Sequence, residues 1–185
     1  GAVTPPIHLS TTFERNPDNS YPRGFVYTRS ENPTYNVAED LLARLESGAG
    51  ALIFSSGMSA AVAPFMTLRP GDHVLAPAVM YWALRKWLLD YSAQWNIAID
   101  FFDVNDPQSA SGLVRSGKTK LVWIETPANP LWDCLDIAWF AQLAHGVGAR
   151  LCVDSTAASP VLSRPIEHGA DLVMHSATKY LNGHS

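Results

Sequence analysis

Short apolar runs alternate with longer segments of helical period over most of the chain. The apolar runs, which are typical of buried strands, are residues 51–54, 73–76, 97–104, 120–125, 150–154 and 171–175. Between them, residues 58–68, 81–95 and 136–147 place apolar side chains three to four positions apart, the period of an amphipathic helix. Strands that alternate with helices in this way predict an α/β fold, with a mostly parallel sheet and helices on both faces.

The beginning of the chain follows a different pattern. Residues 1–32 are rich in Pro, Ser, Thr, Asn and Asp, and no periodicity extends over more than a few positions. We therefore expect an extended N-terminal arm over residues 1–32 and a single domain over residues 33–185. The first helix should begin with Asn32 as its N-cap and Pro33 at its first helical position.

Composition limits the class of protein. A chain of 185 residues with 47% apolar and 16% charged residues builds a core and is not disordered. The net charge of −4 and the lack of a basic run argue against nucleic acid as a partner. Two cysteines, Cys134 and Cys152, make neither a disulfide framework nor a zinc site, the histidines lack metal-ligand spacing, and no apolar run is long enough to span a membrane. We expect a soluble, cytoplasmic protein that binds no metal.

An anion site is the first candidate for chemistry. The run Ser55-Ser56-Gly57-Met58-Ser59 places small residues between an expected strand and an expected helix, where backbone N–H groups lack helical partners. Ordinary helix capping explains such a run equally well when it stands alone. The chain contains neither a P-loop nor a G-x-G-x-x-G motif, which argues against ATPases and Rossmann dehydrogenases.

Other reactive side chains follow other expected strands. Asp154 ends one strand, Lys179 follows another within His175-Ser176-Ala177-Thr178-Lys179, and Tyr81 and Asn129 lie after two more. Singly, these are a turn carboxylate, a solvated lysine and packing residues. Together, at the shared carboxyl edge of a parallel sheet, they supply a partner for a ring nitrogen, a candidate Schiff-base amine, an aromatic plate and an amide. This combination predicts a pyridoxal phosphate site.

Six ordered blocks also carry a family resemblance over essentially the whole chain. They are residues 5–13 (Pro-Pro-Ile with Ser-Thr-Thr-Phe), 27–34 (Tyr-Thr-Arg with Asn-Pro-Thr), 55–58, 125–130 (Glu-Thr-Pro-Ala-Asn-Pro), 153–154 and 175–184 (His-Ser-Ala-Thr-Lys-Tyr with Gly-His). On these blocks the sequence resembles the Cys/Met metabolism, or transsulfuration, family of pyridoxal-phosphate enzymes, which includes cystathionine gamma-synthase, cystathionine lyases and methionine gamma-lyase. The resemblance implies the large cofactor domain of an aspartate-aminotransferase-like, fold-type I enzyme. The chain also opens without Met and stops just after a motif, so we expect an N-terminal fragment that lacks the smaller C-terminal domain and is inactive alone.

The resemblance assigns roles to particular residues. Lys179 would form the Schiff base and then move protons, Asp154 would keep the pyridine nitrogen protonated, and Tyr81 would stack on the ring and act on the leaving sulfur. The remaining residues would contact the cofactor: Gly57 and Met58 through their amides and Ser176 and Thr178 through their hydroxyls at the phosphate, Asn129 at the phenolic oxygen, and Tyr27 and Arg29 at the phosphate of a neighbouring subunit.

The implied function is the making or breaking of a C–S bond at the β- or γ-carbon of a sulfur amino acid in methionine metabolism, within a homo-oligomer that is usually a tetramer. A cystathionine gamma-synthase-like replacement is our first interpretation, with cystathionine beta-lyase, cystathionine gamma-lyase or methionine gamma-lyase as alternatives. A non-catalytic fragment that keeps the fold is a further alternative, and an aminotransferase is disfavoured by the blocks at residues 27–34. Departures from the family pattern at Ser155 and at residues 82–84 leave the substrate open.

Overall fold

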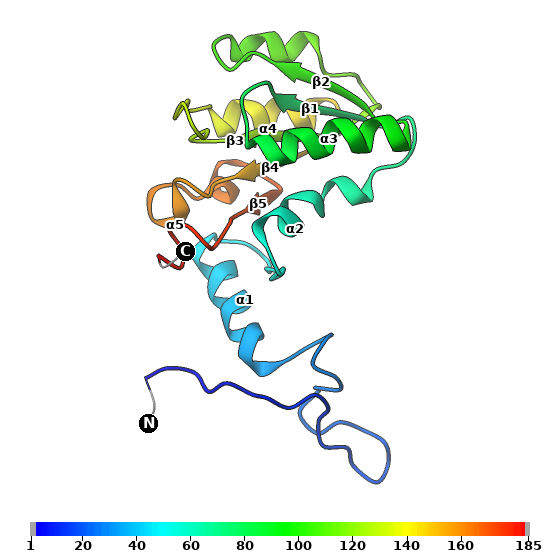
Figure 1. Ribbon diagram of the computed structural model, residues 1–185, viewed down its shortest axis with the longest axis vertical. Coiled ribbons are helices and arrows are strands. Elements are labelled where there is room, and N and C mark those ends of the chain that lie inside the picture. The colour runs from blue at the N-terminus through cyan, green and yellow to red at the C-terminus, as the bar shows by residue number, and fades with distance from the viewer. Residues whose placement is uncertain (1–2, 184–185) are drawn as a thin grey trace. The chain divides into compact units, whose positions relative to one another are not determined.

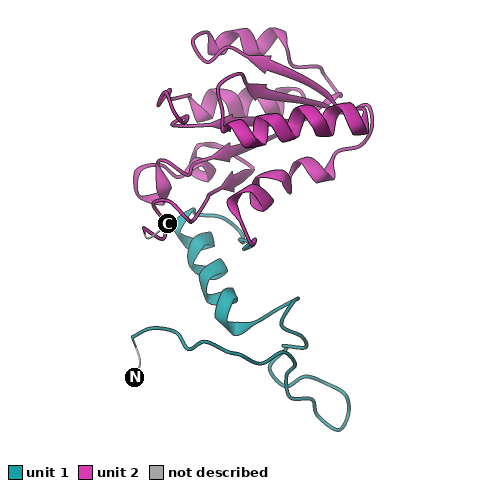
Figure 2. Ribbon diagram, viewed as in Figure 1, with its two compact units in different colours: residues 1–53 teal, residues 54–185 magenta. Residues whose placement is uncertain are grey.

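The computed structural model describes residues 3–183 of the chain, so His184 of the last block lies outside the described residues. Contacts divide the chain into two compact units, residues 1–53 and residues 54–185, which are coloured separately in Figure 2. Helix α1, Pro33–Leu45, groups with the residues that precede it. The boundary between a cofactor domain and an arm over residues 1–32 stays a prediction.

Asn32 organises the first unit. Its side chain caps α1 by accepting the Thr34 N–H at 2.8 Å, as the Asn-Pro start of the helix predicts. The same side chain donates to the Thr28 hydroxyl at 2.6 Å and to the His8 carbonyl oxygen at 3.3 Å. These three bonds use both the oxygen and the nitrogen of the Asn32 amide. Asn32 is buried, whereas α1 itself buries none of its residues.

A five-stranded sheet forms the centre of the second unit (Figure 1). Its strands are β1 (His73–Pro77), β2 (Ala98–Phe102), β3 (Thr119–Glu125), β4 (Arg150–Asp154) and β5 (Leu172–Met174). All neighbours are parallel, in the order β2-β1-β3-β4-β5. The predicted α/β fold with a parallel sheet is therefore confirmed.

Helices cover both faces of this sheet. The α-helices of the second unit are α2 (Gly57–Val62), α3 (Trp82–Trp95), α4 (Ile137–Gly146) and α5 (Ser159–Leu162), and its 3₁₀ helices are η1 (Phe65–Thr67), η2 (Pro107–Gly112) and η3 (Pro165–His168). Side chains alternate along each strand, so Trp123 packs with α2 and α3, whereas Val122 packs with α4. Burial on both faces explains why the strands are apolar throughout. Leu84 and Leu88 of α3 are fully buried, and each such side chain stabilises the fold by roughly 1.5–3 kcal/mol.

Two sequence-based expectations for elements were wrong. Residues 51–54, expected as a strand, have no regular structure, and Leu52 is 76% exposed. The Ile53 N–H donates instead to the Glu39 carboxylate at 2.8 Å, a bond that a strand would have used for a neighbouring strand. The expected helix over residues 58–68 is divided into α2 and η1, with Pro64 between them. Proline has no N–H to donate, so an α-helix does not continue smoothly through it.

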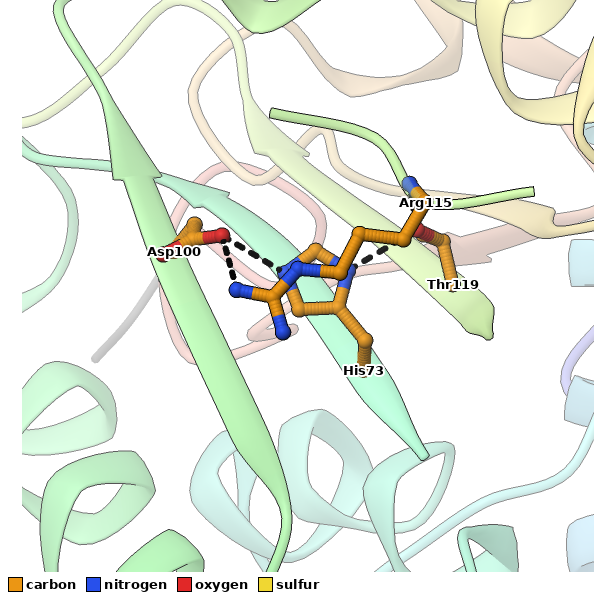
Figure 3. Close-up of polar contacts among 4 residues, drawn as sticks. All are labelled: His73, Asp100, Arg115 and Thr119. Atoms are coloured by element: carbon orange, nitrogen blue, oxygen red, sulfur yellow. Dashed lines mark hydrogen bonds and ion pairs between the residues drawn. The ribbon is translucent and has the colours of Figure 1, made fainter. Parts of the chain in front are cut away.

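A polar network ties three strands together at the amino edge of the sheet (Figure 3). Thr119 Oγ1 accepts the Arg115 N–H at 2.7 Å, so its own proton is free for His73 Nδ1 at 2.8 Å. His73 Nε2 then faces Asp100 Oδ2 at 3.2 Å, and the Arg115 guanidinium donates to the same oxygen at 2.7 Å. Burial and the Arg115 charge lower the pKa of His73, while Asp100 opposes them. His73 is therefore a neutral, structural histidine.

Within residues 3–183, no helix combines the length and the apolar character that crossing a membrane requires.

Candidate active site

The carboxyl ends of three strands meet in register at one edge of the sheet. Glu125 of β3 pairs with Asp154 of β4, and Asp154 pairs with Met174 of β5. The Thr126 N–H donates to the Asp154 carbonyl oxygen at 3.1 Å, and the Ser155 N–H donates to the Met174 carbonyl oxygen at 3.0 Å. These bonds extend the sheet by one step and fix the starting points of the loops that carry the predicted site residues.

Asp154 presents a buried carboxylate at this edge. Its side chain accepts the Thr156 N–H at 3.0 Å, and the residue is only 8% exposed. Burial raises the pKa of Asp154, whereas hydrogen bonds from Thr156 and the charges of His175 and Lys179 act in the opposite direction. A buried carboxylate is stabilised by a partner that donates a hydrogen bond or carries a positive charge, and a protonated ring nitrogen does both.

Helix α2 begins beside the same edge with a capped first turn. Ser56 is its N-cap, and its hydroxyl accepts the Ser59 N–H at 3.0 Å. The amides of Gly57 and Met58 open the helix and have no preceding turn to bond to. They are therefore available as donors to a ligand.

The start of α2 also makes an unusually close approach to the loop after β5. A Cβ atom added to Gly57 would lie 2.7 Å from both Cβ and Oγ of Ser176, a distance that side chains do not tolerate. The Ser176 N–H in turn donates to the Thr156 hydroxyl at 2.8 Å, which connects this loop to the one after β4. Glycine at position 57 thus keeps open the space in which the amides of α2 and the Ser176 hydroxyl come together.

Lys179 lies in the turn that follows Ser176. Its backbone N–H donates to the Ser176 carbonyl oxygen at 3.1 Å, and its amine contacts the Ser176 hydroxyl at the long distance of 3.4 Å. Both Lys179 and Thr178 are exposed. The structure therefore brings the amine close to the Gly57–Ser176 contact and leaves it accessible to a reactant.

Glu125 joins two further predicted residues. One carboxylate oxygen accepts the Tyr81 N–H at 2.6 Å, and the other accepts the Asn129 N–H at 2.8 Å. The pKa of Glu125 is raised to about 7. Burial is the largest cause and the charge of Asp154 adds to it, while the hydrogen bonds from Asn129 and Tyr81 act in the opposite direction. Sequence reasoning placed Glu125 at the end of an expected strand but gave it no role. The available signal was an acidic residue at the end of an otherwise apolar strand.

Tyr27 and Arg29 belong to the first unit, whereas the residues just described belong to the second. The Arg29 guanidinium lies 5.1 Å from the centre of the Tyr27 ring, a cation–π contact, and both residues are exposed. Their expected role at a subunit interface stays a prediction.

A cavity of about 440 Å³ lies at the opposite, amino edge of the sheet. Arg69, Lys120 and Arg150 contribute to its lining, and none of the predicted site residues does. Ligand sites of parallel sheets lie beyond the carboxyl ends of the strands, and the candidate catalytic groups lie there as well. We therefore assign the chemistry to the carboxyl edge.

The groups at the carboxyl edge suit a flat, phosphate-bearing heterocycle with a basic ring nitrogen. The absent side chain of Gly57 leaves room beside Ser176, the buried carboxylate of Asp154 suits a protonated nitrogen, and the exposed amine of Lys179 suits covalent attachment. A parallel sheet that presents these groups defines the class of α/β domains that bind pyridoxal phosphate.

Comparison with known proteins narrows this class to a family. The model of the "Cys/Met metabolism PLP-dependent enzyme" family matches residues 1–185, and the chain belongs to this family, whose cofactor is pyridoxal 5'-phosphate. It is 43% identical to the cystathionine gamma-synthase of Escherichia coli and 39% identical to the cystathionine gamma-lyase of Homo sapiens, covering 100% of this chain and 48% and 45% of those proteins, respectively. The chain spans about half the length of the curated relatives it matches.

Solved structures agree with this assignment. A crystal structure of metB from Corynebacterium glutamicum matches with a TM-score of 0.95 at 38% identity, over 100% of this chain and 48% of that one. The cystathionine gamma-lyase CalE6 from Micromonospora echinospora matches with a TM-score of 0.88 at 40% identity, again over 100% and 48%. The fold-type I cofactor domain expected from the sequence is thus confirmed.

Proposed function

We propose that this chain supplies the cofactor-binding half of an enzyme that makes or breaks a C–S bond at the β- or γ-carbon of a sulfur amino acid. A γ-replacement like that of cystathionine gamma-synthase is the first candidate. The observation that carries the proposal is the convergence of Asp154, Lys179 and the Gly57–Ser176 contact at one edge of the sheet. Family membership and the identities to cystathionine gamma-synthases and gamma-lyases support it.

Pyridoxal phosphate, when bound, supplies an electron sink for the charge left on the substrate α-carbon after its proton is removed. In the proposed arrangement, the amides of Gly57 and Met58 and the hydroxyls of Ser176 and Thr178 bind the phosphate. Asp154 holds a proton on the ring nitrogen, which its buried carboxylate favours by charge and hydrogen bonding.

The remaining residues act on the substrate side. The Lys179 amine would hold the cofactor covalently and, once free, would carry a proton to and from the substrate α-carbon. Tyr81 orients the ring and Asn129 donates to the phenolic oxygen, with both backbones held by Glu125. With the α-proton removed, a leaving group could depart from the β-carbon, whereas departure from the γ-carbon would also require removal of a β-proton. The group expelled would be a thiol in a lyase, and in a synthase an incoming thiol would take its place.

The proposal extends to the setting of the enzyme. We place it in a homo-oligomer, with Tyr27 and Arg29 facing a neighbouring subunit. We also place it in the cytoplasm, which the two free cysteines, Cys134 and Cys152, support because an oxidising compartment favours paired ones.

Reduction of the full-length protein with borohydride in the presence of pyridoxal phosphate tests the site. We expect the pyridoxyl mass on the peptide that contains Lys179 and its loss in Lys179→Ala. Label spread evenly over Lys86, Lys118 and Lys120 would contradict the assignment.

Product analysis then tests the reaction. The full-length protein is given cysteine together with a homoserine whose γ-oxygen carries a leaving group, and in parallel it is given cystathionine. Formation of cystathionine supports the synthase assignment. Cleavage of cystathionine to a thiol, an oxo acid and ammonia supports the lyase alternative, to which the 39% identity with the human gamma-lyase lends weight. Covalent cofactor attachment with neither activity, and with no thiol released from methionine, would contradict C–S chemistry.

A further inference from the structure

The carboxylate of Glu125 joins two loops that are distant in the sequence. Glu125 is the last residue of β3 and is 6% exposed. Its carboxylate accepts the N–H groups of Tyr81 and Asn129, one with each oxygen. Tyr81 lies between β1 and α3, whereas Asn129 lies in the loop after β3 itself. One side chain therefore fixes the backbone at both positions.

Only a carboxylate can make this pair of bonds from this place. Its two oxygens both accept, and two N–H donors approach them. Glutamine would offer one oxygen and turn an NH₂ group toward the second N–H, and aspartate is one methylene too short to keep both distances. The arrangement is also costly, because the buried Glu125 faces the buried carboxylate of Asp154, whose charge raises the pKa of Glu125.

We propose that Glu125 is a positioning residue, whose carboxylate sets the Tyr81 ring and the Asn129 amide in register with each other at the cofactor. The inference rests on the proposed function, which assigns Tyr81 to the ring and Asn129 to the phenolic oxygen. Glu125 reaches neither group of the cofactor itself in this scheme. It acts by holding the backbone from which both side chains project.

Hydrogen exchange at the two amides tests the bonds directly, without reference to activity. In the full-length protein at a pH above 7, where the Glu125 carboxyl is mostly ionised, Glu125→Gln should speed exchange of the Tyr81 or the Asn129 amide by at least about tenfold, because a bond to a charged acceptor is lost. Amides in the middle of β1 and β4 should be unchanged. Glu167→Gln, which removes an exposed carboxylate paired with Arg164, is the matched control. Unaltered exchange at both amides would overturn the proposal.

The state of the cofactor supplies the second readout. We expect Glu125→Gln to retain the pyridoxyl label on Lys179. The variant should, however, alter the visible circular dichroism of the bound cofactor and release the cofactor several-fold faster, because the contacts of the Tyr81 ring and the Asn129 amide are displaced. An unchanged visible spectrum and release rate would refute the positioning role even if the exchange result holds. A wild-type protein that takes no label on Lys179 would instead defeat the proposed function, while amide exchange still reports on Glu125.

A measurement on the wild type covers the case in which Glu125→Gln does not fold. With tyrosine and asparagine labelled selectively, the amide resonances of Tyr81 and Asn129 should shift with pH at one shared midpoint, because both N–H groups bond to one carboxylate. Asp154 is the charged neighbour that faces Glu125 from β4, so the midpoint should persist in Asp154→Asn, displaced to lower pH. Separate midpoints, or no shift at either amide, would overturn the proposal.

Discussion

Replacing Gly57 with alanine should close the space between α2 and the loop after β5. The added Cβ atom would lie 2.7 Å from Cβ and Oγ of Ser176 and 3.1 Å from its Cα. To restore an ordinary contact of about 3.4 Å or more, the Ser176 backbone has to move, and its N–H bond to Thr156 resists this movement. The change therefore strains the junction that we assign to the phosphate.

The magnitude follows from two opposing effects. Overpacking of a well-packed contact costs about 1–3 kcal/mol. Alanine is favoured over glycine in a helix by about 0.5–1 kcal/mol, and by less at a first position such as Gly57. We expect Gly57→Ala to lower the free energy of unfolding of the cofactor-free, full-length protein by about 1–2 kcal/mol. The dissociation constant for pyridoxal phosphate should rise by about tenfold or more, since displacement of Ser176 removes a phosphate contact.

Denaturant unfolding and equilibrium dialysis with the cofactor measure these two quantities. Gly112→Ala is the matched control, because a Cβ at Gly112 meets nothing within 4 Å and its backbone is not left-handed. Adding Ser176→Gly to Gly57→Ala should restore most of the stability without restoring affinity, because it removes the two atoms at 2.7 Å together with the hydroxyl and leaves only the contact with Cα at 3.1 Å. If Gly57→Ala behaves like Gly112→Ala in both assays, the close approach and the phosphate assignment are wrong.

Three further predictions concern buried polar groups. Asp154→Asn should raise the free energy of unfolding of the cofactor-free protein at neutral pH by about 1 kcal/mol or more, because it removes a buried charge. The same change should abolish most turnover. A variant with wild-type turnover would contradict the pairing of Asp154 with the ring nitrogen. Folding raises the pKa of Glu125 from 4.5 to about 7, so the protonated carboxyl group stabilises the folded state. This stabilisation is complete below pH 4.5, and about 3 kcal/mol of it is lost as the pH rises to 7. The free energy of unfolding, measured across this range, should depend less on pH in Glu125→Gln. Thr119→Val should destabilise the protein by about 1–3 kcal/mol because it strips His73 and the Arg115 N–H of a partner, and a thermal melt identical to wild type would exclude the network drawn in Figure 3.

The sequence predicted those parts of the fold that local patterns determine. Strand β4 occupies residues 150–154 as expected, and Asn32 caps α1 ahead of Pro33 as expected. Residues 51–54 have an equally apolar pattern but form no strand, because a strand requires a neighbouring backbone as well as an apolar run. A pattern read along one segment does not contain that partner.

In the candidate site, too, some features follow from the sequence and others only from the structure. The positions of Asp154 and Lys179 follow from the rule that ligands bind at the carboxyl ends of parallel strands, and the sequence was enough to place them there. The bridge from Glu125 to Tyr81 joins residues 44 positions apart, through two loops whose paths depend on the packing of β1 beside β3. Neither loop carries a periodic pattern, so their meeting point could be found only in the structure.

The two edges of the sheet differ in how far their polar groups satisfy one another. At the amino edge, Asp100 contacts both His73 and Arg115, and Thr119 bonds to both of them as well, so these side chains hold strands together even though His73 Nε2 makes no full hydrogen bond with any described residue. At the carboxyl edge, the Lys179 amine has only a long contact with a hydroxyl, and the Ser155 hydroxyl is buried without a hydrogen-bond partner among residues 3–183. Within the described part of the chain, buried polar atoms without a hydrogen-bond partner occur at both edges, so the feature that distinguishes the carboxyl edge is the exposed, loosely held amine of Lys179 near the buried carboxylate of Asp154. The contacts of this chain alone thus support the proposal that the amino edge stabilises the sheet and the carboxyl edge carries the chemistry.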